Sequence, residues 1–412
     1  MSAGLLAPLA NPVYRWLWAS SMVSNFGTLM QGVGLAWLMT SLTTSPVLIA
    51  MVPFAALAPV FLFGMVGGAL ADAVDRRKWL LGTQCAMLLS ALAMGLFAAS
   101  GAATPAAMLA LAFCLGTASA LNIPAWQAIV QELVPPAQVA SAVSLNSMSF
   151  NTARMLGPVA GGITVGAWGP APVFFFNAAS YLAVIWALAR WKGSGPPAVH
   201  TGILSGIVPG VREGVLYLAR AAHLRGPLLR AASISFCAAS VMALLPAIAR
   251  DRLGLSASTF GILLGVFGAG ALCGGGSVPW MRRRVAAGRI VAAGSFAVAA
   301  ALAAVAAVPT AGWIGAALFL LGASWIACMV NLNVSVQTSV DPAFRGRAMA
   351  LYFTIFQGSF ALGSLAAGFV ASGFGFSGSL AVFSLLLVAA SLALARFPIP
   401  EPGPAGLLHI ES

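Results

Sequence analysis

Twelve long apolar runs dominate this sequence of 412 residues, and they limit what it can fold into. They lie at about 15–39, 46–71, 79–100, 105–131, 137–166, 170–190, 227–250, 256–280, 288–308, 311–337, 344–371 and 376–396. An α-helix needs about 20 mostly apolar residues to cross the hydrocarbon core of a bilayer. Because lipid offers no partner for backbone polar groups, the spans are expected to be helical. The sequence therefore predicts an all-α membrane protein with twelve transmembrane helices.

The composition excludes several other classes of protein. Only 7% of the residues are charged, whereas a soluble domain carries about 25%. A soluble enzyme, a disordered chain and a disulfide scaffold are therefore excluded. The five cysteines each stand alone in an apolar run, without metal-ligand or C-x-x-C spacing. The sequence also has neither a Walker-type phosphate loop nor a Ser/His/Asp arrangement at span depth. We expect no enzyme activity, no cofactor and no metal.

The basic residues orient the spans, because lysine and arginine favour cytoplasmic loops. With the N-terminus inside the cell, all but three of the 20 lysines and arginines fall on the cytoplasmic side; the exceptions are Arg154, Arg250 and Arg252. We therefore expect a multi-pass protein of the inner (plasma) membrane with both termini in the cytoplasm. The net charge of +12 is then a topology signal and not a nucleic-acid surface. The first run lacks a small-residue cleavage site and is expected to be a retained helix.

The second half of the chain repeats the first at a constant shift of 206 residues. Matched positions include loop residues as well as glycines, among them Gly68 and Gly274, Arg76 and Arg282, Pro136 and Pro342, and Gly162 and Gly368. We expect an N-terminal six-helix bundle at 1–192, a cytoplasmic linker at 193–226, a C-terminal six-helix bundle at 227–400 and a cytoplasmic tail at 401–412. Parallel repeats of this kind are typical of transporters with a central pathway.

The loop after the second run, at 67–78, carries a recognisable motif. It resembles the G-x-x-x-D-x-x-G-R-[KR] loop of the major facilitator superfamily, with Asp75 in place of the usual second glycine. The matching residues are Gly68, Asp72, Arg76 and Arg77. The resemblance implies a twelve-helix transporter whose inner gate closes when Asp72 latches the start of helix 11.

The residues of this motif also allow simpler roles. Arg76 can pair with Glu132 at the inner end of the fourth run. For Asp72 and Arg76 the inner-gate role is the better interpretation. For Arg77 and Lys78 we favour a role in topology alone.

The fifth run holds a glycine–proline motif at 157–162. Its residues are Gly157, Pro158, Gly161 and Gly162. Pro158 removes a backbone donor and kinks a helix, and the glycines permit close helix packing. The motif resembles the G-P-x-x-G-G element of antiporter-type exporters in the same superfamily. Together with 134–136 and 146–158 it is similar to the enterobactin-exporter-like branch, also called transmembrane secretion effector. This resemblance implies efflux; ordinary small-residue packing is the alternative.

Arg154 lies near the middle of the fifth run, where a charge costs at least about 2.5 kcal/mol. All eight acidic residues lie in loops, span ends or tails. The polar stripe on its helix face spans an arc of about 80° and consists of Ser144, Ser147, Asn151, Arg154 and Pro158. We favour a role in attracting an anionic or polar substrate. The alternative is a structural arginine bonded to backbone carbonyls that the proline and glycines leave free.

Other amides and hydroxyls recur in the runs that this fold places around the pathway. With the arginine, the predicted substrate pathway comprises Asn25, Thr28, Asn122, Asn151, Arg154, Asn331, Asn333 and Gln357. A single amide more often joins two helices, at about 0.6 kcal/mol, so the assignment depends on the pattern across helices. Trp126 and Trp325 could stack on a substrate, but packing or interfacial anchoring is the better interpretation of each.

We expect a monomeric secondary active transporter that exports a small organic solute, siderophore-like or drug-like, by alternating access in the lipid bilayer. The resemblance implies proton antiport. The spans themselves hold no titratable carboxylate or histidine, and the nearest carboxylates are Asp72, Glu132 and Asp341. One alternative is an importer or facilitator of a small metabolite on the same fold. Another is a receptor or assembly factor that transports nothing.

Overall fold

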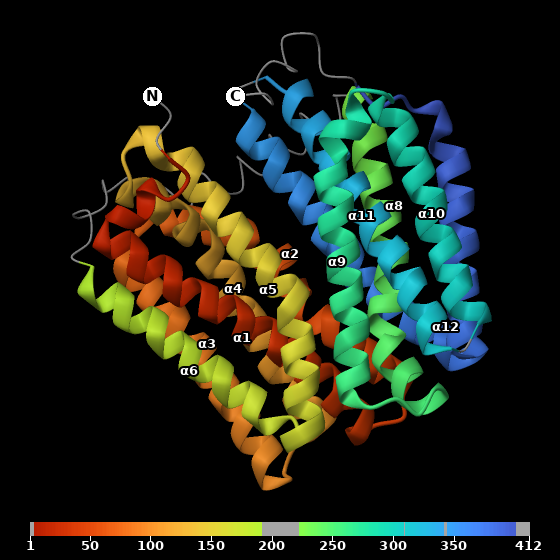
Figure 1. The fold of residues 1–412 in the computed structure, drawn as a ribbon, viewed down its shortest axis with the longest axis horizontal. Helices are drawn as coiled ribbons and strands as arrows, with labels where there is room; N and C mark the ends of the chain where they lie inside the picture. Colours follow the sequence, from red (N-terminus) through yellow and green to blue (C-terminus); the bar gives the residue numbers. More distant parts are fainter. Residues whose placement is uncertain (1–3, 192–221, 309, 342–343, 401–412) are drawn as a thin grey trace. The chain divides into compact units, whose positions relative to one another are not determined.

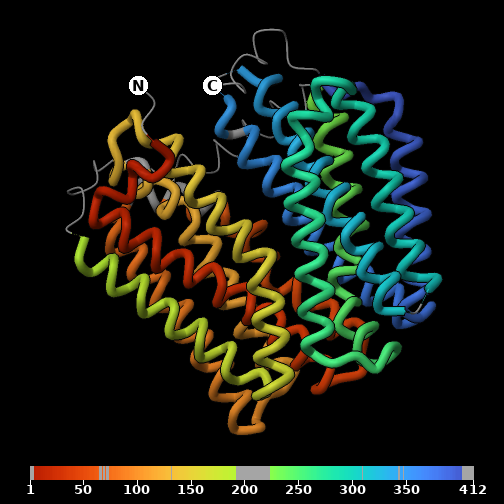
Figure 2. The backbone as a smooth tube through the Cα atoms, in the orientation of Figure 1, coloured from red at the N-terminus to blue at the C-terminus, as the bar shows by residue number. Residues whose placement is uncertain are grey.

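The computed structural model describes residues 4–191, 222–308, 310–341 and 344–400, and over these residues it contains helices and no strand (Figure 1). The α-helices are α1 (Pro12–Leu42), α2 (Pro46–Ala73), α3 (Arg76–Ser100), α4 (Pro105–Leu133), α5 (Val139–Trp168), α6 (Ala171–Arg190), α8 (Ala222–Ala247), α9 (Ala257–Arg282), α10 (Ala287–Ala307), α11 (Ala311–Ser339) and α12 (Arg345–Ala393). Most of the predicted linker and all of the predicted tail lie outside the described residues. Figure 2 follows the same course as a tube through the Cα atoms.

Local sequence explains where several helices begin. Asn11 accepts hydrogen bonds from the backbone N–H groups of Val13 and Tyr14 at the start of α1. Thr104 accepts one from Ala107 at the start of α4. Such side chains satisfy the N–H groups that a helix leaves unpaired in its first turn. Proline opens α1, α2 and α4, where its missing N–H removes no helical bond.

Nine helices in the described part of the chain are long and apolar enough to cross a membrane. One of these segments is Ala348–Arg396, which lies mostly in α12 and covers two predicted runs. Gly375 interrupts it with a backbone of φ 71° and ψ 175°, which is not helical. Glycine adopts positive φ at little cost because it has no Cβ. The interruption falls between the predicted runs 344–371 and 376–396.

The chain divides into two compact units. Unit 1 comprises Met1–Thr44, Ala55–Ile207 and Gly254–Gly265, and unit 2 comprises Ser45–Phe54, Val208–Leu253 and Val266–Ser412. Each unit holds most of one sequence repeat. The first turns of α2 nevertheless belong to unit 2, and the first turns of α9 belong to unit 1. This exchange of short segments is not apparent from the repeat itself.

The same packing scheme occurs in both units. In unit 1, α1 packs against α5 and α6, and α3 packs against α4 and α6; α3 and α6 lie side by side in Figure 1. In unit 2, α8 packs against α12, and α10 packs against α11 and α12. Glycines at equivalent positions support this scheme. Gly116 of α4 lies against the backbone of Ala56 in α2, and Gly322 of α11 lies against the backbone of Phe267 in α9.

Candidate functional site

Arg154 lies in the middle of α5, with its side chain half-buried. The guanidinium carbon is 5.2 Å from the centre of the Phe150 ring, one helical turn earlier. A cation over an aromatic face is attracted by the ring quadrupole. Within the described ranges, the guanidinium forms neither an ion pair nor a hydrogen bond. The alternative role predicted for it, bonding to freed backbone carbonyls, has no supporting contact there.

Only one of the other polar side chains of the stripe on α5 has a hydrogen-bond partner among the described residues. The Ser144 hydroxyl donates to the carbonyl of Ala140 at 2.9 Å, as serines in helices commonly do. Ser147 is exposed and Asn151 is half-buried. Neither side chain has a hydrogen-bond partner among the residues for which the structure gives positions. Asn151 and Arg154 can therefore bind water or a polar solute without breaking a hydrogen bond or an ion pair to a described residue.

Two predicted pathway residues lie on α1 and have different surroundings. Asn25 is half-buried and has no side-chain partner in the described segments. The Thr28 hydroxyl lies 3.5 Å from Asn177 Oδ1 and 3.3 Å from the Tyr181 hydroxyl. Asn177 also donates to Gln31 Oε1 at 2.7 Å. Thr28, which is itself exposed, therefore contacts a network of buried side chains that joins α1 to α6.

Sequence reasoning missed most of this network. Asn177 and Tyr181 are both buried on α6, one helical turn apart, and Asn177 Nδ2 donates to the Tyr181 hydroxyl at 3.2 Å. Hydrogen bonds between membrane helices are a recurrent means of association. The spacing of an asparagine and a tyrosine four residues apart within the run 170–190 is the signal that could have identified it.

The remaining predicted pathway residues fall into three groups. Asn122 is buried and donates to Thr83 at 2.8 Å, joining α4 to α3. On α11, Asn331 donates to the Ala327 carbonyl, and Asn333 accepts from Gln337, both at 2.8 Å. The Oδ1 atom of Asn331 is buried and accepts no hydrogen bond from any residue that the structure describes. Gln357 on α12 is half-buried and makes no side-chain hydrogen bond to any described residue.

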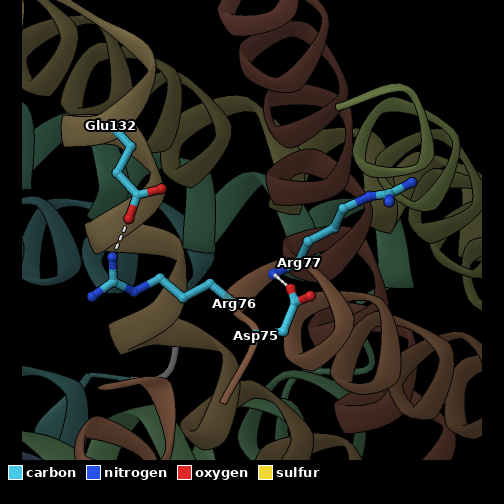
Figure 3. A network of polar contacts seen from close by, with 4 residues as sticks. All are labelled: Asp75, Arg76, Arg77 and Glu132. Atoms are coloured by element: carbon cyan, nitrogen blue, oxygen red, sulfur yellow. Dashed lines mark hydrogen bonds and ion pairs between the residues drawn. The ribbon is translucent and has the colours of Figure 1, made fainter. Parts of the chain in front are cut away.

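The predicted pair between Arg76 and Glu132 is present at the start of α3 and the end of α4 (Figure 3). The two side chains are 34% and 23% exposed, so solvent weakens their attraction. Asp75 caps α3, since its carboxylate accepts from the backbone N–H groups of Arg77 and Lys78 at 3.0 and 3.1 Å. Within the same predicted motif, Gly68 and Asp72 lie in α2. The predicted latch depends on the Asp72 side chain, which is outside the described residues.

Arg77 makes a specific contact in addition to its predicted role in topology. Its side chain extends away from that of Arg76 in Figure 3. The Nε and Nη2 groups donate to the carbonyls of Leu188 and Ala189 at 3.1 and 2.6 Å. These carbonyls belong to the last turn of α6, where the helix dipole favours a cation. Arg77 therefore ties the start of α3 to the end of α6.

The glycine–proline motif forms a packing seam along α5. A methyl group at Gly157 would lie 2.9 Å from Leu29 Cβ, and one at Gly161 would lie 2.8 Å from the Cα of Met30, both on α1. A methyl group at Gly162 would lie 2.6 Å from the Ala257 carbonyl oxygen, in the first turn of α9. Pro158 is buried within the same helix. These glycines permit the backbones of α1 and the start of α9 to approach α5 closely.

Sequence comparisons agree with this architecture. A family model described as transmembrane secretion effector matches residues 3–407. An uncharacterized MFS-type transporter of Bacillus subtilis, YfiS, is 25% identical over 345 residues, which is 80% of each chain. The staphyloferrin A transporter of Staphylococcus aureus is 26% identical over 172 residues, which is 42% of this chain and 43% of that relative.

Solved structures with low sequence identity share the fold. A bacterial homologue of the human lysosomal transporter Spinster, in an inward-facing and occupied conformation, superposes with a TM-score of 0.76 at 15% identity, covering 96% of this chain and 99% of the other. A D-xylose–proton symporter superposes with a TM-score of 0.70 at 15% identity, covering 95% and 99%. With the family match over nearly the whole sequence, these findings show that the chain belongs to the transmembrane secretion effector family of major facilitator transporters.

Proposed function

We propose that this protein is a secondary active transporter that exports a small organic solute by alternating access. Its twelve spans would comprise α1–α6, α8–α11 and the two parts of α12 on either side of Gly375. The bundles at 1–192 and 227–400 would move against each other in the inner membrane, with both termini in the cytoplasm. The name of the family favours export, and the fold is one that transporters use.

Arg154 is the strongest support for this function and indicates the charge of the solute. A guanidinium at span depth is costly unless it is hydrated or paired. This one is half-buried and lacks an ion pair or hydrogen bond throughout the described segments. Asn151 lies one turn earlier and is equally available. An anionic or strongly polar solute, siderophore-like or drug-like, would supply the missing partner.

Protons are the proposed coupling ion. The carboxylates nearest the spans are those of Asp72, Glu132 and Asp341, all at inner ends. Glu132 is paired with Arg76, and protonation of its carboxylate would release that pair. Alternatively, transport could be driven by the membrane potential acting on the negative charge of the solute, and Arg154 would then interact with that charge.

Counterflow in proteoliposomes tests transport and coupling, with pH and membrane potential clamped separately. The probes are staphyloferrin A and 2-naphthoate, two organic anions of different structure. We compare Arg154→Gln and Arg154→Lys with Arg15→Gln, because Arg15 is exposed at the start of α1. Exchange of at least one probe that falls in Arg154→Gln, recovers in Arg154→Lys and is unchanged in Arg15→Gln supports the proposal.

Everted membrane vesicles then decide the direction of transport. An exporter coupled to protons accumulates the probe in an acidified lumen, whereas an importer depletes it. Equal counterflow by the wild type and Arg154→Gln would show that the arginine is structural. Absence of counterflow for both probes, together with retained binding of a protein partner, would favour the receptor alternative.

A further inference from the structure

Four aromatic rings from three helices meet in unit 2. The ring of Trp325 on α11 lies 5.7 Å from that of Phe267 on α9, 5.9 Å from that of Phe356 and 5.8 Å from that of Phe360, both on α12. The Phe356 ring is stacked on the indole with an interplanar angle of 22°. We name these four residues the aromatic cluster. Rings at such separations attract one another beyond the effect of burial alone.

The indole N–H at the centre of this cluster has no hydrogen-bond partner among the described residues. Trp325 is only 8% exposed, and its Nε1 atom is buried with no acceptor in the part of the chain that the structure describes. Buried tryptophan N–H groups usually find an acceptor, because an unsatisfied donor costs about 1–3 kcal/mol. A phenylalanine would fill most of the same volume without that cost. The buried donor is therefore available to an acceptor that comes from outside the described residues, such as a bound solute.

The α12 side of the cluster continues toward solvent or lipid along one helix face. Phe353, Phe356, Gln357 and Phe360 share that face, since residues three, four and seven apart lie on one side of a helix. Phe360 is 9% exposed, Phe356 is half-buried and Phe353 is 51% exposed. Rotation of the half-buried side chains of Phe356 or Gln357 would open a route to the cluster from this side. The amide of Gln357 adds a polar group that no described residue occupies.

We propose that the aromatic cluster binds a planar aromatic ring of the transported solute, whose oxygen substituent accepts a hydrogen bond from the Trp325 N–H. This inference rests on the proposed function, because it names the chemical class of the solute. Stacking on Trp325 and Phe356 recognises the flat π-face, and the single N–H selects a ring that carries an acceptor. A saturated ring of the same size presents no such face and binds more weakly.

Two matched alcohols test this site independently of Arg154, because neither carries a charge that the guanidinium would attract. Binding of radiolabelled 2-naphthol and decahydro-2-naphthol to the full-length protein in nanodiscs is measured by equilibrium dialysis, and binding to empty nanodiscs is subtracted. The wild type is expected to bind 2-naphthol at least about fivefold more tightly. Trp325→Phe keeps a ring and removes the N–H, so it is expected to weaken the binding of 2-naphthol about tenfold. The binding of naphthalene, which has the flat ring without an acceptor and is measured in the same way, is expected to be unchanged.

Two further variants serve as controls for Trp325→Phe. Trp313→Phe changes the same residue type on α11 at an exposed position and is expected to have no effect. Phe356→Leu, at a half-buried position, is expected to remove the preference for the flat ring even if Trp325 variants fold poorly. Equal binding of the two alcohols by the wild type overturns the inference, as does equal weakening of 2-naphthol and naphthalene in Trp325→Phe.

Binding of the corresponding carboxylates distinguishes a failure of the aromatic site from a failure of the proposed role of Arg154. If 2-naphthoate and decahydro-2-naphthoate bind equally tightly and both lose affinity in Arg154→Gln, the proposed role of Arg154 stands and the aromatic site is wrong. If 2-naphthol is preferred as expected while 2-naphthoate binds Arg154→Gln as well as the wild type, the aromatic site stands and the role of Arg154 is wrong.

Discussion

Helix α5 and the first part of α12 occupy equivalent positions in the sequence repeat but carry different chemistry. Asn151 on α5 corresponds to Gln357 on α12, so each helix carries an amide at the same position of the repeat. Three residues later, Arg154 corresponds to Phe360. The cation on α5 has no anionic partner in the described residues, whereas the phenyl ring on α12 packs against Trp325.

The packing of the same two helices differs much less. Gly157 brings α5 against Leu29 of α1, and its equivalent Gly363 brings α12 against the backbone of Phe236 in α8. The repeated scaffold therefore requires a small residue at this position in both halves. Two bundles of one design can thus offer a polar, cationic helix face in one unit and an aromatic face in the other.

The largest expected effect on transport concerns the two equivalent positions with different residues, Arg154 and Phe360. Arg154→Gln should lower the kcat/KM for an organic anion by at least about thirtyfold, because losing a desolvated charge contact costs about 2–5 kcal/mol. Phe360→Leu preserves apolar volume and should lower it no more than about fivefold. Initial rates of 2-naphthoate uptake into proteoliposomes measure both. Similar losses for the two variants would show that the positions are functionally equivalent.

The second prediction concerns the matched glycines. Gly363→Ala should destabilise the protein by about 1–3 kcal/mol, because the new methyl group meets a backbone carbonyl that cannot rotate away. Gly157→Ala should cost less, since its methyl group would overlap Leu29 Cβ less deeply than the methyl group at position 363 would overlap the Phe236 carbonyl. Thermal unfolding of the two variants in one detergent gives the order. An equal or larger effect at Gly157 would contradict the expected difference in steric overlap.

The third prediction compares the arginines that cap the last helix of each repeat. In unit 2, Arg230 donates to the carbonyls of Leu394 and Phe397, both at 2.7 Å. Arg230 is buried, whereas Arg77 in unit 1 is half-buried. Arg230→Met should therefore destabilise the protein by about 2 kcal/mol and Arg77→Met by about half as much.

A matched control exists for this pair. Arg289→Met replaces an exposed arginine at the start of α10 and should leave the unfolding midpoint unchanged. The two capping arginines come from non-equivalent positions, on α8 and α3. If Arg77→Met is the more harmful change, the bonds to the end of α12 are not the stronger cap.

The smallest effect is expected for the ion pair between Arg76 and Glu132. Both side chains are partly exposed, and exposed pairs contribute about 0.2–1 kcal/mol. A double-mutant cycle with Arg76→Gln and Glu132→Gln, followed by thermal unfolding, measures the coupling. The coupling should fall as salt is raised from 0.05 to 0.5 M, because salt screens exposed charges. A coupling above about 2 kcal/mol that does not respond to salt would contradict this assignment.

Apolar runs and turn residues were sufficient to predict the helices of this protein. The runs at 105–131 and 311–337 correspond to α4 and α11, since only a helix satisfies its own backbone in lipid. The break at Gly375 lies between two predicted runs. One boundary differs, because α8 begins at Ala222, within the predicted linker.

Side-chain partners depended on which helix faces meet. Thr28 and Asn25 are three residues apart in the sequence, yet only Thr28 reaches the network around Asn177. The cap that Arg77 places on α6 joins residues more than a hundred positions apart. No local pattern predicts such pairs, because the rotation of a helix about its axis is decided by packing against its neighbours.

The sequence alone determined the membrane class and the helical character of the chain, because hydrophobic length acts locally; of the twelve predicted spans, nine helices in the described residues are long and apolar enough to cross a membrane. Only the tertiary structure decided which polar groups are already satisfied. Asn122 donates a hydrogen bond to Thr83, whereas Arg154 and Gln357 have no hydrogen-bonding partner in the described parts of the chain. A polar side chain in lipid must find a partner somewhere, and its identity follows from the neighbouring helix and not from the residue's own position in the sequence.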